Sequence, residues 1–134
     1  MSGTNGTNGT NQHLAVEAIV TTPDATISGA AKLMREYDVS AVLVLDPHDA
    51  HTCRSVEVVT DRDLVVEVTA LELDPDAITV GDLVNNGLTA RRGASRLRDL
   101  VHGMRSRGVE RIPVSRGGRV TGVLMIEELL EIVR

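Results

Sequence analysis

Aromatic side chains are almost absent from this chain of 134 residues. Phenylalanine and tryptophan do not occur and Tyr37 is the one tyrosine, so aromatic residues make up 1% of the sequence. Modules that bind single-stranded nucleic acid stack bases on exposed aromatic rings. The net charge of −5 also disfavours a surface that grips a phosphate backbone. Composition therefore argues against nucleic acid as a partner.

The sequence has little cysteine and no long apolar run. A single thiol, Cys53, cannot form an intrachain disulfide, which fits a reducing compartment. No apolar stretch approaches the roughly 20 residues of a membrane-spanning helix, and the first residues lack the charged and apolar regions of a secretory signal. We therefore expect a cytoplasmic protein that does not act at a membrane.

What is present is the composition of a folded domain preceded by a polar tail. Hydrophobic residues make up 42% and charged residues 25% of the chain, which is ordinary globular usage. Residues 1–13 are built largely from the triplet GTN and carry almost no apolar side chain to offset the entropy of ordering. We expect these residues to form a disordered tail.

The periodicity of the apolar residues indicates an α/β fold. Spacings of i, i+3, i+4 and i+7 predict helices that include residues 27–34, 97–104 and 126–133. Short segments rich in β-branched residues alternate with them and predict strands. These segments are residues 40–45, 56–60, 110–115 and 119–125.

An internal repeat orders these elements. Met34 and Val39 recur as Met104 and Val109, 70 positions later, and after a shorter connecting loop the offset falls to 65. Both copies then run helix, strand, strand, helix. We expect a first repeat at residues 14–77 and a second at 78–134, packed about a pseudo-twofold axis because neither is large enough to close a core alone.

In this order and with this repeat, the chain resembles the tandem CBS-domain pair, or Bateman module, of the stand-alone bacterial type. The resemblance is carried by residues 21–46, 57–68, 78–84 and 97–133. It implies two βαββα units and frequent dimerisation. It also implies a non-catalytic regulatory module that senses an adenine nucleotide between the repeats and signals to a separate effector protein, with no cofactor.

The resemblance also implies which residues line the two clefts. In the first repeat, the family's pattern of a hydroxyl followed by a carboxylate is present at Thr60, Asp61, Arg62 and Asp63. A carboxylate there would accept from the ribose hydroxyls, while the hydroxyl and the helix N-terminus would face phosphate. Arg62 would supply a phosphate-binding cation there if its side chain turned inward.

The matching positions of the second repeat depart from this pattern. Met125 replaces the hydroxyl and Glu128 replaces the shorter acid, although this repeat has a strand cation, Arg111, where the first has Ala41. With aromatics lacking, the adenine ring would lie against aliphatic side chains such as Val109. The first cleft is therefore the better candidate for a ribose contact.

Two other interpretations of the same residues stay open. Asp61 or Asp63 at the start of a helix is also a common N-terminal cap, in which case the chain is a ligand-free CBS-fold interaction scaffold. The loop at residues 48–53 carries His48, His51 and Cys53, so a metal or thiol sensor is a second alternative, although polar loop residues explain it as well. No sequence motif of a hydrolase, zinc protease or phosphate loop occurs, so we expect no catalysis.

The charges are divided unevenly between the repeats. Residues 36–82 carry twelve acidic side chains against two arginines, a net charge of −10, whereas residues 91–119 carry nine arginines against two acids, a net charge of +7. Opposite charges favour a head-to-tail homodimer. We expect the helices that contain Met34 and Met104 to supply its apolar contacts.

Overall fold

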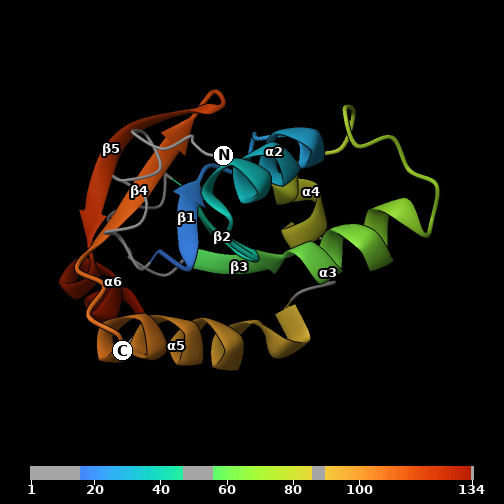
Figure 1. Cartoon of the computed structure of the whole chain (residues 1–134). Coiled ribbons are helices and arrows are strands. Elements are labelled where there is room, and N and C mark those ends of the chain that lie inside the picture. The colour runs from blue at the N-terminus through green and yellow to red at the C-terminus, as the bar shows by residue number, and fades with distance from the viewer. Residues whose placement is uncertain (1–15, 47–55, 86–89, 134) are drawn as a thin grey trace.

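The computed structural model describes residues 16–46, 56–85 and 90–133 (Figure 1). The expected tail at residues 1–13 and the loop at 48–53 lie outside this range. The elements in chain order are β1 (Ala18–Thr21), α2 (Ile27–Tyr37), β2 (Ala41–Leu45), β3 (Val56–Thr60), α3 (Asp61–Leu64), η2 (Val65–Thr69), α4 (Val80–Asn85), α5 (Ala90–Ser106), β4 (Arg111–Arg116), β5 (Arg119–Met125) and α6 (Ile126–Val133). The order of helix, strand, strand and helix is confirmed in both repeats.

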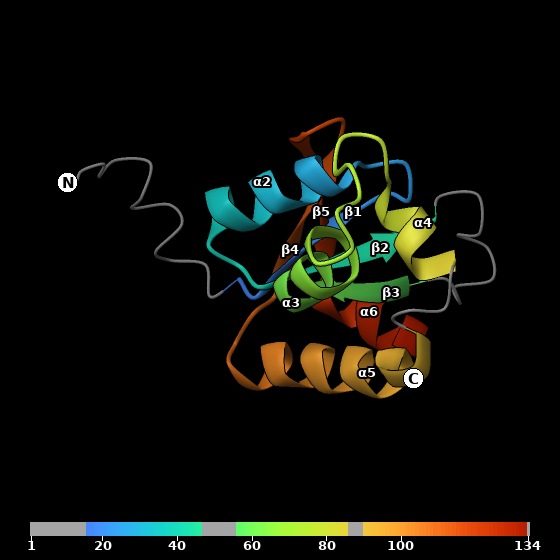
Figure 2. The same cartoon turned by 90° about the vertical axis from the view of Figure 1, so that its right-hand side faces the viewer.

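Five strands form one sheet in the order β3-β2-β1-β4-β5. The central strand, β1, runs parallel to β2 and to β4. The outer pairs, β2 with β3 and β4 with β5, are antiparallel hairpins. Figure 2 shows α2 and α4 on one side of this sheet and α5 and α6 on the other. The α/β fold class is therefore confirmed as a three-layer arrangement.

The strand registers reproduce the sequence repeat. Ala41 pairs with Thr60 across the first hairpin, and Arg111 pairs with Met125 across the second. Arg111 follows Ala41 by 70 positions and Met125 follows Thr60 by 65, which are the offsets between the two copies. Arg111 is therefore the structural equivalent of Ala41, and Met125 that of Thr60.

The helix ends repeat as well. The N–H of Val39 donates to the carbonyl of Met34, and the N–H of Val109 donates to that of Met104, both at 3.0 Å. The chain leaves the first helix through the left-handed conformation at Asp38 and leaves the second at Gly108. Both turns aim the following strand back along the sheet.

The two repeats place their helices on opposite faces of the sheet. Val42, Val44 and Val59 pack with α2 and α4, whereas their second-repeat equivalents Ile112 and Val114 face α5 and α6. A half turn about the axis of β1 moves the first hairpin onto the second and leaves the direction of the strands unchanged. The same half turn exchanges the two faces of the sheet. The pseudo-twofold axis expected from the sequence therefore runs along β1.

The structure differs from two complete βαββα units at the start of the second repeat, where a first strand was expected. The positions equivalent to β1 are residues 88–91, of which 90 and 91 already belong to α5, and 86–89 lie outside the described range. Thr79 forms one isolated bridge with Thr26. The side chains of Thr79 and Asp82 then cap each other's backbone N–H at 3.0 Å and start α4. In the described residues, β1 alone joins the two hairpins.

The close approach of α4 to the first repeat provides a way to test this arrangement. The N–H of Gly81 donates to the carbonyl of Pro23 at 2.9 Å, and a Cβ at Gly81 would lie 2.8 Å from that oxygen. We expect Gly81→Ala to lower the free energy of unfolding by about 1–3 kcal/mol, because backbone atoms must move apart. Denaturant unfolding measures the change.

The matched control is Gly122→Ala in β5, where an added Cβ meets nothing within 4 Å. It should change stability by less than about 0.5 kcal/mol. Equal losses from the two substitutions would contradict the packing of α4 described above.

Candidate functional site

A cavity of about 360 Å³ lies between the first hairpin and α5 of the second repeat. The first repeat contributes the start of β2, the end of β3 and the residue before β1, while the second repeat contributes one face of α5. The lining residues are Glu17, Ser40, Ala41, Val58, Thr60, Asp99, Leu100, Gly103 and Arg107. The cavity is thus an inter-repeat site.

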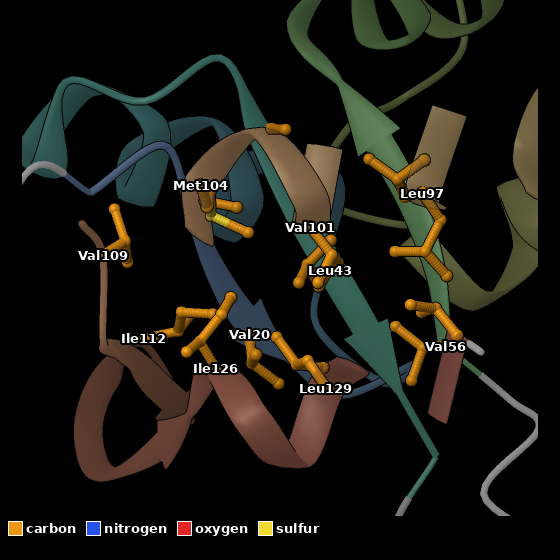
Figure 3. Packing of buried hydrophobic residues seen from close by; sticks show 14 residues of the cluster. Val20, Leu43, Val56, Leu97, Val101, Met104, Val109, Ile112, Ile126 and Leu129 are labelled. Atoms are coloured by element: carbon orange, nitrogen blue, oxygen red, sulfur yellow. The ribbon is translucent and has the colours of Figure 1, made fainter. Parts of the chain in front are cut away.

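The packing of α5 explains where this space is. Figure 3 shows Leu97, Val101 and Met104 pointing from α5 toward the sheet, where they join the core that contains Leu43. The neighbouring stripe of α5 carries Gly103, which has no side chain to fill the gap. Across the cavity stands Ala41, where the second repeat has an arginine. Small residues on both walls therefore leave a cavity beside a close-packed core.

Thr60 is the residue of the expected first-cleft motif that lines this cavity. Its hydroxyl accepts from the N–H of Asp63 at 3.2 Å, and the carboxylate of Asp63 accepts from the N–H of Thr60 at 2.9 Å. This capping box begins α3. The Thr60 oxygen keeps its proton available for donation to a neighbour in the cavity.

The other members of that motif lie elsewhere. Asp63 is 2% exposed and sits beneath the cavity wall, in the capping box. Asp61 and Arg62 are exposed on α3, and neither lines the cavity. The structure therefore places Thr60 in the cavity, Asp63 behind it, and the remaining two residues outside.

Arg111 and Met125 of the second repeat lie on the second hairpin, at the positions equivalent to Ala41 and Thr60 in the cavity wall. Helix α2 leaves this surface uncovered. The N–H of Met125 donates to the carboxylate of Glu128 at 3.0 Å, so the acid keeps its capping role although the hydroxyl is lost. Met125 is 40% and Val123 56% exposed, and Arg111 is exposed at the start of β4. Val109, by contrast, is buried in the core beside α5.

Three charged residues of the cavity were missed by sequence reasoning. Asp99 comes from α5, Arg107 directly follows α5, and Glu17 precedes β1; Arg107 and Glu17 form an ion pair between the repeats. The two acids and one base give the lining a net charge of −1. Gly103, which interrupts the stripe of larger residues on α5, was a sequence signal for space there. The partner across that space required the tertiary fold.

Among the residues that the structure describes, no three histidine, cysteine, aspartate or glutamate side chains gather in a way that could hold a metal ion. In the same part of the chain, no helix has the length and apolar character needed to cross a bilayer. The loop at residues 48–53 lies outside that range, so its metal or thiol role stays a prediction.

The burial of the two capping acids predicts different effects of removing them. Asp63→Ala should lower the free energy of unfolding by about 1–3 kcal/mol, because it leaves the N–H of Thr60 without its buried acceptor. Glu128→Ala should cost less than about 1 kcal/mol, since Glu128 is exposed and water can replace it. Thermal unfolding of the two variants compares them, and a larger loss from Glu128→Ala would contradict the assignment.

Two tandem α/β repeats that share one sheet and have a cavity between them define a tandem-repeat module. The CBS domain model matches residues 15–70 and again 80–134, so the chain belongs to the CBS domain family. CBS-domain pairs are usually regulatory or ligand-binding, and CBS domains are generally non-catalytic.

Curated relatives agree with this family. The chain is 30% identical over 114 residues to an uncharacterized protein of Methanocaldococcus jannaschii, covering 85% of this chain and 60% of that protein. It is 29% identical over 99 residues to Hypoxic response protein 1 of Mycobacterium tuberculosis, covering 74% of this chain and 66% of that protein. The matched part thus spans about 60–66% of the length of these relatives.

Solved structures of CBS proteins are similar at lower identity. The crystal structure of Hypoxic Response Protein I with two coordinated zinc ions is 21% identical, with a TM-score of 0.44, covering 90% of this chain and 95% of that one. The hexameric CBS-CP12 protein from bloom-forming cyanobacteria is 24% identical, with a TM-score of 0.45, covering 90% of this chain and 70% of that one.

Proposed function

We propose that this chain is a non-catalytic regulatory module that binds an adenine nucleotide in the inter-repeat cavity and signals to a separate effector protein in the cytoplasm. The observation that carries the proposal is the cavity itself, with the hydroxyl of Thr60 in its wall. A cavity bounded by both repeats is the place where a ligand can alter how the repeats contact each other.

The size and charge of the cavity favour a small nucleotide. Its volume of about 360 Å³ lies near the lower end of the roughly 300–1,000 Å³ of small-molecule sites. A net lining charge of −1 repels a triphosphate more strongly than a monophosphate. We therefore propose a ligand of the size of adenosine or its monophosphate.

The lining suggests how such a ligand lies. Asp99 can accept from the ribose hydroxyls, and Thr60 can donate to the sugar or the phosphate. Val58 and Leu100 offer apolar surface to the base. In this proposal Asp63 is a positioning residue, because its carboxylate and N–H hold Thr60 in place.

The remaining residues of the expected clefts keep a secondary place in the proposal. Asp61 and Arg62 are exposed beside the cavity, and Arg111 and Glu128 mark the open wall of the second repeat. Binding of a second nucleotide at that wall stays a prediction, and a contact from Val109 would require the core around it to open.

Calorimetric titration with adenosine, AMP and ATP tests the proposal. We expect AMP to bind more tightly than ATP. Thr60→Val should weaken AMP binding about ten-fold at nearly constant volume, because it removes the hydroxyl's bond to the ligand together with its cap on the N–H of Asp63. Thr69→Val, at an exposed threonine of η2 outside the cavity, is the matched control and should bind as the wild type does.

Failure of the wild-type protein to bind any of the three ligands at millimolar concentration would overturn the proposal and favour the ligand-free interaction scaffold. The metal or thiol sensor is tested separately by zinc titration of the wild-type protein and of Cys53→Ser. Zinc binding lost in that variant would assign the loop a role of its own.

Self-association is the second part of the proposal, and the expected role of the helices with Met34 and Met104 in it stays a prediction. Met34 is 7% and Met104 0% exposed, so the apolar stripes of α2 and α5 are used inside the protomer. Among the residues that the structure describes, the large exposed apolar side chains belong to β5 and to η2 with the turn that follows it. The basic patch comprises Val120, Val123 and Met125 with Arg111, Arg116 and Arg119, and the acidic patch comprises Val65, Val66, Leu71 and Leu73 with Glu67, Glu72 and Asp74.

These two patches fit a second copy of this chain. Figure 1 shows β5 at one end of the molecule and, at the other, the segment after α3 that carries the acidic patch. Each patch combines apolar surface with charge of one sign, and the signs are opposite, so they complement each other between two copies but not within one. We propose a homodimer in which two chains lie antiparallel, head-to-tail, with two such contacts.

Charge exchange tests the dimer. Arg119→Glu alone and Glu72→Arg alone should each weaken dimerisation at low salt by placing like charges together, whereas a mixture of the two variants should restore it through a heterodimer with both pairs complementary. Sedimentation velocity measures the association, and salt should weaken the wild-type dimer modestly, since screening acts over about 10 Å at 0.1 M. A strictly monomeric wild-type protein at low salt would refute it.

A further inference from the structure

We infer that Arg107 is the phosphate-binding cation of the cavity, and that its ion pair with Glu17 is a clasp between the repeats which a ligand phosphate opens. This inference rests on the proposed nucleotide binding and adds the residue that recognises phosphate. It also gives the contact through which binding reaches the first repeat.

The backbone position of Arg107 aims its side chain at the cavity. Its N–H donates to the carbonyls of Gly103 and Met104, both at 3.1 Å, which closes the last turn of α5. A guanidinium nitrogen lies 3.5 Å from where a Cβ on Gly103 would stand. The guanidinium therefore folds back over the bare surface of Gly103, and both residues line the cavity.

Its present partner is a residue that phosphate can displace. Glu17 and Arg107 are 32% and 59% exposed at their side chains, so water already competes for the pair, and such pairs add little stability. A phosphate offers the guanidinium a doubly charged, bidentate acceptor. Glu17 has enough exposure to turn toward solvent when it is displaced.

The other described arginines near the site have different positions. Arg105, two residues earlier in the last turn of α5, reaches Glu127 of α6 at 3.7 Å and so stays within the second repeat. Arg62 and Arg111 are exposed and do not line the cavity. Arg107 is thus the cation that the described lining contains. It would supply the positive charge for phosphate that Ala41, at the strand position, cannot supply.

The exchange of partners has a structural consequence. In the free protein the ion pair joins the end of α5 to the residue that precedes β1, two segments 90 positions apart. When phosphate takes Arg107, this link between the repeats is released. The ligand-bound state therefore differs from the free state at the start of the central strand.

Titration of four proteins with AMP and with adenosine tests both parts. We expect Arg107→Gln to weaken AMP binding about ten-fold or more and to leave adenosine binding unchanged, because adenosine carries no phosphate. Glu17→Gln should tighten AMP binding a few-fold, since the competing carboxylate is gone, again without effect on adenosine. Arg105→Gln, at an equally exposed arginine in the last turn of α5, is the matched control.

The ratio of the dissociation constants for AMP and adenosine distinguishes a loss of phosphate recognition from a general structural effect, because a general effect weakens both ligands alike. An unchanged ratio in Arg107→Gln, with the wild-type protein binding both ligands, overturns the inference and leaves the proposed function intact. Unchanged AMP affinity in Glu17→Gln overturns the clasp. A wild-type protein that binds neither adenosine nor AMP overturns the proposed function and the inference together.

Discussion

The fold depends on one short strand that is hydrogen-bonded on both edges. All four residues of β1 are at most 2% exposed, and the strand runs parallel to both of its neighbours. Parallel neighbours cannot be joined by a tight turn, so the chain must cross a face of the sheet through a helix. Burial of β1 on both faces therefore requires helices from each repeat, and neither repeat forms a complete core without the other.

Local patterns predicted the elements well because each is amphipathic in the period of its own structure. The strands at residues 56–60 and 119–125 and the helix at 126–133 begin and end as expected. The offsets of 70 and 65 hold in the strand registers from Arg111 to Val114, beyond which a bulge shifts the second hairpin. Propensity did not predict that positions 90 and 91, which are equivalent to the end of β1, belong to α5 and not to a strand.

The candidate site was predictable in part for a similar reason. Thr60 and Asp63 form a local motif, and local motifs are visible in a sequence. The cavity depends instead on the juxtaposition of Ala41 with Gly103, two small residues from different repeats, and neither has a side chain that points to a function. The family pattern likewise led to Arg111, whereas the cation in the cavity comes from the end of α5.

The same half turn about β1 explains why the two clefts differ. In the first repeat, the wall that carries Ala41 and Thr60 is covered by α5 and becomes a cavity, whereas the equivalent wall with Arg111 and Met125 is exposed. A wall that faces a second element offers a small ligand contacts from two sides, and the polar side chain of Thr60 suits such a site. An open wall with methionine, valine and arginine suits a protein surface. Under the proposed function, the hydroxyl of Thr60 would therefore serve the ligand site, whereas Met125 would serve the contact between copies of the chain.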